Sequence, residues 1–71
     1  MINKIREDLI NKKGHILKFR HNGSRNQIEE FNGIIIGTYK YIFIVKTTDK
    51  KEEIKSFSYS DVLIENLEIY N

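Results

Sequence analysis

The sequence has no cysteine and no proline among its 71 residues. Without cysteine the chain can form neither a disulfide nor a thiolate zinc site, and we expect a cytoplasmic protein. Long apolar runs are missing too, since residues 34–36 and 41–45 fall far short of the roughly 20 residues of a membrane span. The acidic side chains near the N-terminus argue against a signal peptide. With no linker and no internal repeat, residues 1–71 are predicted to form a single domain.

A chain of this length lies near the lower limit at which one core stabilises a fold. Such a core leaves roughly 3–5 kcal/mol of net stability, which is little for a strained catalytic site and leaves self-association open. The formal net charge is +2 but it is unevenly spread: residues 1–25 carry seven basic and two acidic side chains, and residues 26–71 carry five basic and eight acidic ones. This asymmetry indicates either a mixed solvated surface or an anionic partner.

The first segment, residues 3–13, has the apolar periodicity of a helix. The apolar stripe consists of Ile2, Ile5, Leu9 and Ile10. Asn3 is the expected N-cap, and Gly14 is the expected left-handed stop.

After the helix the period changes to two, which predicts strands. The expected strands are residues 15–21, 27–39, 41–46, 53–58 and 64–70. Gly33 and Gly37 within the second strand indicate a bulge or a sharp bend. The third strand is apolar on both faces, so we expect both of its faces to be covered. Residues 59–63 should form one helical turn capped by Ser60, with Val62 and Leu63 plugging the barrel.

This element order predicts a mainly β fold. The expected architecture is a small five-stranded SH3-like or Sm-like barrel, with an N-terminal α-helix over an open end and a short helical turn before the last strand.

Catalytic constellations are missing from the sequence. Glu29 and Glu30 are adjacent on a strand, so they point to opposite faces and cannot act as a pair. His15 and His21 should lie about 20 Å apart along a strand, too far for one metal ion to join them. We therefore expect no enzyme activity, no cofactor and no metal site.

Basic and aromatic residues suggest binding instead. Arg20, Asn22 and Arg25 cluster at the first predicted hairpin, and small barrels bind single-stranded nucleic acid by combining such a basic groove with stacking rings. Strand aromatics also pack cores, however, and both interpretations stay open. Residues 57–63 likewise either cap a helical turn or present side chains to a partner. The candidate binding surface comprises Arg20, Asn22, Arg25, Tyr39, Tyr59 and Asp61.

Three segments together resemble the Veg family of small Gram-positive bacterial proteins, also called biofilm formation stimulators. They are residues 22–29 (NGSRNQIE), 33–39 (GIIIGTY) and 57–69 (FSYSDVLIENLEI). The family pattern combines a lysine-rich helix, a basic Asn-Gly turn, a Thr-Tyr-Pro element and, near its C-terminal end, a Ser-Tyr-x-Asp segment. This chain differs at residues 24–26, where the family turn is more basic, and at Lys40, where the family often has proline.

The resemblance implies a non-enzymatic regulator that stimulates biofilm formation by antagonising a transcriptional repressor of matrix genes. It implies no catalytic residues. Two hypotheses follow: a regulator whose partner is a protein such as a repressor, and a small barrel whose partner is RNA or DNA.

Overall fold

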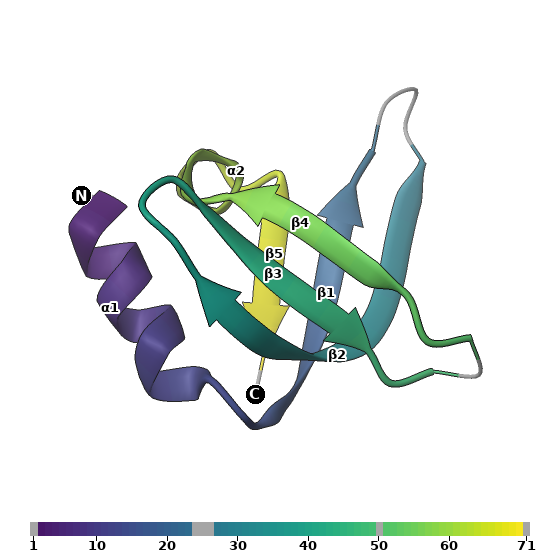
Figure 1. Cartoon of the computed structure of the whole chain (residues 1–71). Helices are drawn as coiled ribbons and strands as arrows, with labels where there is room; N and C mark the ends of the chain where they lie inside the picture. The colour runs from purple at the N-terminus through teal and green to yellow at the C-terminus, as the bar shows by residue number, and fades with distance from the viewer. Residues whose placement is uncertain (1, 24–26, 50, 71) are drawn as a thin grey trace.

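The computed structural model describes residues 2–23, 27–49 and 51–70. Along the chain it contains α1 (Ile2–Lys12), β1 (Ile16–Asn22), β2 (Ile28–Thr38), β3 (Ile42–Thr47), β4 (Ile54–Ser58), α2 (Tyr59–Leu63) and β5 (Leu67–Tyr70) (Figure 1). The predicted mainly β class and the predicted element order are confirmed.

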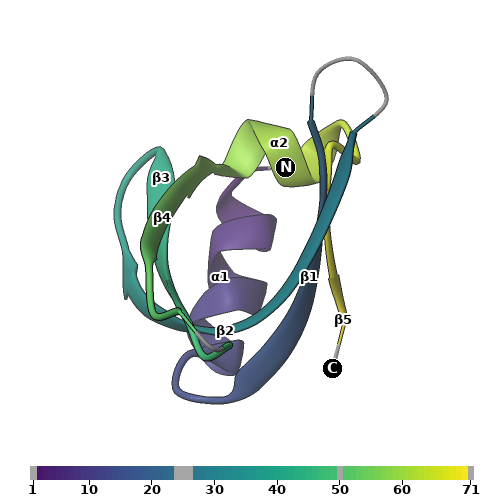
Figure 2. The same cartoon turned by 90° about the vertical axis from the view of Figure 1, so that its right-hand side faces the viewer.

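The strands form one antiparallel sheet in the order β4-β3-β2-β1-β5. The sheet curves strongly, and α1 lies across the opening between its two halves (Figure 2). The register of β2 against β3 shifts between Ile35 and Gly37, which confirms the bulge predicted there. Within the described residues no ladder joins β4 to β5, so the sheet stays open.

Helix α1 ends as predicted but begins differently. Gly14 has a φ of 89°, the left-handed conformation expected after the last turn. Asn3 lies inside the helix, so its prediction as the N-cap is wrong. The buried part of the predicted stripe is Leu9, with Ile5 partly buried beside it, whereas Ile10 is exposed.

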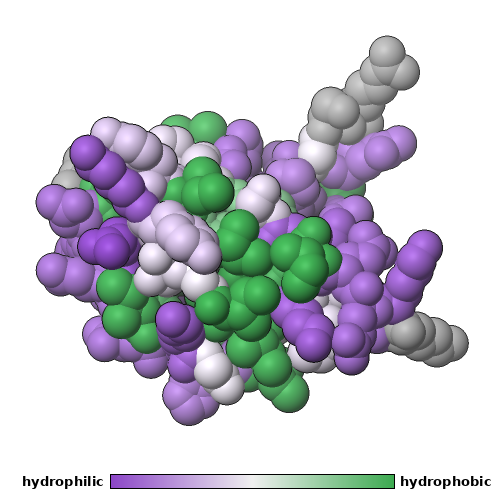
Figure 3. Space-filling view, viewed as in Figure 1, coloured by the Kyte–Doolittle hydropathy of each residue, from purple (hydrophilic) through white to green (hydrophobic). Residues whose placement is uncertain are grey.

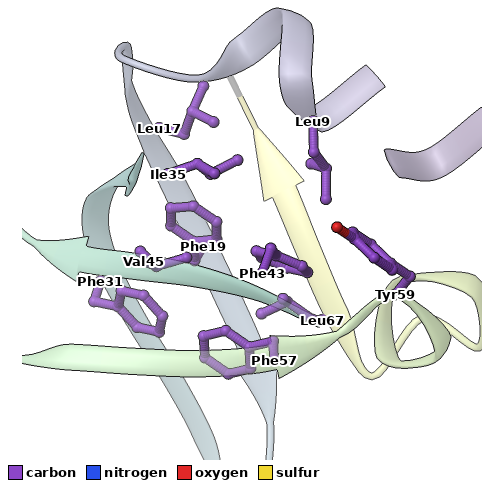
Figure 4. Packing of buried hydrophobic residues seen from close by; sticks show 10 residues of the cluster. All are labelled: Leu9, Leu17, Phe19, Phe31, Ile35, Phe43, Val45, Phe57, Tyr59 and Leu67. Atoms are coloured by element: carbon purple, nitrogen blue, oxygen red, sulfur yellow. The ribbon is translucent and has the colours of Figure 1, made fainter. Parts of the chain in front are cut away.

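The core is a row of aromatic rings on the concave face of the sheet (Figure 4). The rings of Phe19 and Phe31 stack at a centroid distance of 5.2 Å, and Phe31 stacks on Phe57 at 6.0 Å. Phe43 continues the row and stacks on Tyr59 at 5.6 Å. Burying such side chains supplies about 1.5–3 kcal/mol each, so this row contributes a large part of the stability of the core.

Strand β3 differs from its prediction. Its inner residues Phe43 and Val45 are fully buried, but Ile42 on the outer face is 41% exposed and Ile44 is half-buried. The expectation that both faces are covered is therefore wrong. The described helices pack at the ends and on the concave side, which leaves the convex side of the strand in solvent.

The short helix α2 is capped by Ser58 and not by Ser60. Its end is set by Glu65, whose positive φ of 64° stops the helix and delays β5 until Leu67. Val62 packs against the core as predicted, whereas Leu63 is exposed, so its predicted role as a plug is wrong.

Gly33 provides a stability test because its neighbours leave no room for a side chain. A Cβ atom there would lie 2.7 Å from Val45 Cγ1 and 3.0 Å from the Lys46 carbonyl oxygen. We expect Gly33→Ala to lower the free energy of unfolding by about 1–3 kcal/mol, as overpacked cores do. Urea denaturation measures this change, and Ser56→Ala on the exposed face of β4 is the control. An unchanged urea midpoint for Gly33→Ala would show that β2 and β3 can shift apart enough to accommodate the added methyl group without a loss of stability.

Candidate functional site: a tyrosine hairpin beside an isoleucine face

Arg20 lies on the outer face of β1, between two carboxylates. In register it pairs with Glu30 of β2 and with Glu68 of β5. The neighbouring Lys18 forms an ion pair with Glu30, with an N–O distance of 3.3 Å. These acidic neighbours offset the positive charge that the sequence analysis assigned to this region.

The other two binding residues predicted at this hairpin are Asn22 and Arg25. Asn22 is exposed at the end of β1, and its backbone N–H donates to the Asn66 carbonyl at 2.7 Å. Arg25 lies outside the described residues. A binding site at this hairpin therefore stays a prediction.

Tyr59 has a completely buried ring and contacts the turn between β2 and β3 through two hydrogen bonds. Its hydroxyl donates to the Tyr39 carbonyl oxygen at 2.5 Å, and its backbone N–H donates to the Tyr41 carbonyl at 3.1 Å. A buried ring cannot contact a partner on the folded surface, so Tyr59 acts as an anchor for the turn between β2 and β3.

Asp61 also has a structural role. Its backbone N–H donates to Ser58 Oγ at 3.2 Å, and its carboxylate accepts from the Ser58 N–H at 3.3 Å. This reciprocal pair is a capping box that holds the first turn of α2. Of the two interpretations of residues 57–63, the geometry favours the structural one.

The tyrosine hairpin, which we define as Tyr39, Lys40 and Tyr41, is held from two helices. Besides the bond from Tyr59 at the start of α2, the Tyr39 carbonyl accepts a hydrogen bond from Arg6 Nε of α1 at 3.2 Å. The Tyr39 N–H donates to the Ile42 carbonyl at 2.8 Å and closes the turn. The hairpin is thus held in place by hydrogen bonds within the chain.

The rings of this hairpin point to solvent. Tyr39 is 56% exposed and Tyr41 is 66% exposed. The ring of Tyr39 lies over Gly37, where a Cβ would stand 3.1 Å from Tyr39 Cε2. Lys40 Nζ lies 5.3 Å from the centroid of the Tyr41 ring, a cation–π contact. Lys40 therefore adds a positive charge to the aromatic surface, at a position where the Veg family often has proline.

An isoleucine face continues from the hairpin along the convex side of the sheet. It consists of Ile34, Ile36, Ile42, Ile44 and Ile54. Figure 3 shows apolar side chains gathered over these strands, and Ile54 is 63% exposed at their edge. Contiguous exposed apolar surface is typical of interaction sites. The sequence pattern did not reveal this face, because the apolar residues of β3 were expected to be covered on both sides.

The two histidines lie in different surroundings. His21 packs edge-on against the Phe57 ring with a centroid distance of 5.2 Å, and His15 is exposed before β1. Among the described residues, no three histidine or carboxylate side chains gather closely enough to hold a metal ion. Within the same ranges, neither helix has the length and apolarity of a membrane span.

One prediction tests the anchor under the hairpin. Tyr59→Phe removes the bond to the Tyr39 carbonyl, and we expect it to cost about 1 kcal/mol of unfolding free energy. For a chain of this size, that loss lowers the thermal midpoint by about 4–8 °C. Tyr41→Phe, which removes an exposed hydroxyl, should leave the midpoint unchanged. Equal midpoints for the two variants would contradict the anchoring role.

A second prediction concerns Tyr70 at the end of β5. Its hydroxyl donates to the Glu68 carboxylate, which raises the pKa of the phenol against a weaker opposing effect of Arg20. The raised pKa means that the pair stabilises the fold at neutral pH, and this contribution is lost as pH rises through the folded pKa. We expect Glu68→Gln to lower the Tyr70 pKa in an alkaline NMR titration of the tyrosine Cζ signals. An unchanged titration curve would exclude this bond in solution.

A known protein family matches nearly the whole chain. A family model described as the biofilm formation stimulator VEG matches residues 1–70. A search of curated proteins finds no match to the chain. The family match covers the helix, every described strand and the Ser-Tyr-x-Asp segment that anchors the hairpin. The chain therefore belongs to the Veg family of biofilm formation stimulators.

Proposed function

We propose that the chain is a non-enzymatic regulator that promotes biofilm formation by binding another protein through the tyrosine hairpin and the isoleucine face. The observation that carries this proposal is the exposure of Tyr39 and Tyr41 on a turn anchored from both α1 and α2. Membership of the Veg family supports the biofilm role.

The physical basis is burial of apolar surface at low entropic cost. Each square ångström of apolar surface removed from water contributes about 25 cal/mol. Tyrosine is enriched among the residues that dominate binding energy in protein interfaces. Because the hairpin is already hydrogen-bonded to Tyr59 and Arg6, little ordering remains to be done on binding.

The proposed partner is a transcriptional repressor of matrix genes, as the family resemblance implies. Its contact surface should be apolar at the centre, to cover Ile42 and Ile44. Acidic side chains should lie at its rim, close to Arg6 and Lys40. Binding at this face would stimulate biofilm formation by keeping the repressor from its DNA.

A second candidate function is binding of single-stranded nucleic acid. One observation favours it: Lys40 lies over the exposed ring of Tyr41, and Arg6 contacts the backbone of the same turn at Tyr39. Proteins that bind single strands without sequence preference combine cations and aromatic rings in this way. The apolar face next to the hairpin favours a protein partner, since phosphate contacts gain nothing from isoleucine.

A double variant tests the proposed face. Tyr41→Ala with Ile42→Thr should weaken binding to the purified matrix-gene repressor at least tenfold, as the loss of interface anchors does. Isothermal titration calorimetry measures the affinity, and a complementation assay for biofilm mass measures the effect in cells. Ile64→Thr is the control, because Ile64 is an isoleucine outside the face that is more exposed (62%) than Ile42 (41%). Wild-type affinity and biofilm mass in the double variant would refute the proposal.

Fluorescence anisotropy distinguishes the nucleic-acid candidate from the protein-binding one. It is measured with labelled single-stranded RNA and DNA, at low and at physiological salt. Steeply salt-dependent binding that is lost in Lys40→Ala would favour nucleic acid at the tyrosine hairpin. Loss in Arg25→Ala instead would place the site at the first hairpin. Absence of binding at low salt would remove this candidate.

A further inference from the structure

Strand β5 is an edge strand whose free side can be identified. The Asn22 N–H donates to the Asn66 carbonyl at 2.7 Å, which sets the phase of the ladder between β1 and β5. The pairs Arg20↔Glu68 and Lys18↔Tyr70 follow in the same phase, so the backbone groups of Glu68 and Tyr70 face β1.

The alternate residues of β5 direct their backbone groups away from the sheet. These residues are Leu67 and Ile69. No described residue forms a hydrogen bond with their outward N–H or C=O groups. Unpaired groups at a sheet edge are a template for one more strand.

A groove of about 420 Å³ runs beside this free edge, between α1 and β5. Besides β5 itself, its apolar lining is Ile5 and Leu9 from α1 and Val62 from α2. Figures 1 and 2 show α1 and β5 as separate elements, with α2 near one end of β5. The groove therefore places an apolar wall next to open backbone donors and acceptors.

The rim of the groove is acidic, although the chain as a whole carries a net charge of +2. Three carboxylates line it, Asp8, Glu65 and Glu68, against one ammonium group, Lys12. Glu68 lies opposite Arg20 in register, so Asp8 and Glu65 are the carboxylates left to face an occupant. Charges of one sign around a concave apolar site select an occupant of the opposite sign. A basic occupant is thus favoured over an acidic one.

We propose that this groove binds an extended segment of a partner protein in which basic and apolar residues alternate, and that the segment adds to β5 as a sixth strand. Its main chain would pair with Leu67 and Ile69. Because strand side chains alternate between faces, the apolar ones would enter the groove toward Leu9 and the basic ones would meet Asp8 and Glu65. The proposal does not depend on the isoleucine face, which lies on the convex side of the sheet.

The test uses the full chain labelled with nitrogen-15 and a short synthetic peptide of alternating lysine and valine. We expect NMR shift changes at Leu9, Leu67 and Ile69 on titration. We also expect amide exchange at Leu67 and Ile69 to slow when the peptide is bound, since their N–H groups would be paired. A peptide with N-methyl groups along its pairing edge should not bind, because it has the same side chains but lacks those donors.

Charge variants test the acidic rim. Asp8→Lys should weaken binding of the lysine–valine peptide about three- to tenfold, and the loss should shrink at high salt. Glu7→Lys, on the adjacent position of α1 but outside the groove, is the matched control. The double variant of Tyr41 and Ile42 should bind this peptide normally, which separates the two surfaces.

Several results would overturn the proposal. Equal binding of a glutamate–valine peptide would exclude charge selection, and equal binding of the N-methylated peptide would exclude strand addition. Failure of the lysine–valine peptide to bind at millimolar concentration would also refute it. Concentration-dependent dimers in sedimentation, with the Leu67 and Ile69 amides protected in the absence of peptide, would assign the edge to a second copy of the chain.

Discussion

The structure depends on one constraint: a chain of this size can cover only one face of its sheet. The buried rings of Phe19, Phe43 and Tyr59 fill the concave side, and α1 completes it by placing Leu9 over the open end. No described element covers the convex side of β2 and β3, so Ile42 and its neighbours remain in contact with water. The same geometry that concentrates stability on one side creates an exposed apolar surface on the other.

Tyr59 connects these two sides. Its ring belongs to the core, and its hydroxyl and backbone N–H hold the turn that presents Tyr39 and Tyr41 to solvent. The capping box of Ser58 and Asp61 fixes the turn of helix from which Tyr59 projects. The Ser-Tyr-x-Asp segment that contributes to the family resemblance is therefore a local device for positioning a distant hairpin, and none of its described contacts requires a ligand.

The chain therefore has two apolar surfaces whose bordering charges are of opposite sign. The tyrosine hairpin with the isoleucine face is apolar, with Arg6 and Lys40 at its border, whereas the groove beside β5 is apolar inside and acidic at its rim. Under the two proposals, the chain would bind two different segments of one partner, or two partners, without overlap. This arrangement suits a member of the Veg family of biofilm formation stimulators.

The sequence by itself determined the mainly β class, the order of elements, the stop at Gly14 and the bulge near Gly37, because these follow from local periodicity and backbone freedom. It also determined the family through its motifs. Only the tertiary structure decided which side chains are free to bind. Periodicity distinguishes the two faces of β3 but cannot show whether anything covers the second one, and the tyrosines look alike until packing buries Tyr59 and exposes Tyr39. Likewise, the charge of Arg20 is plain in the sequence, but its position between Glu30 and Glu68 depends on strand register, which long-range pairing alone sets.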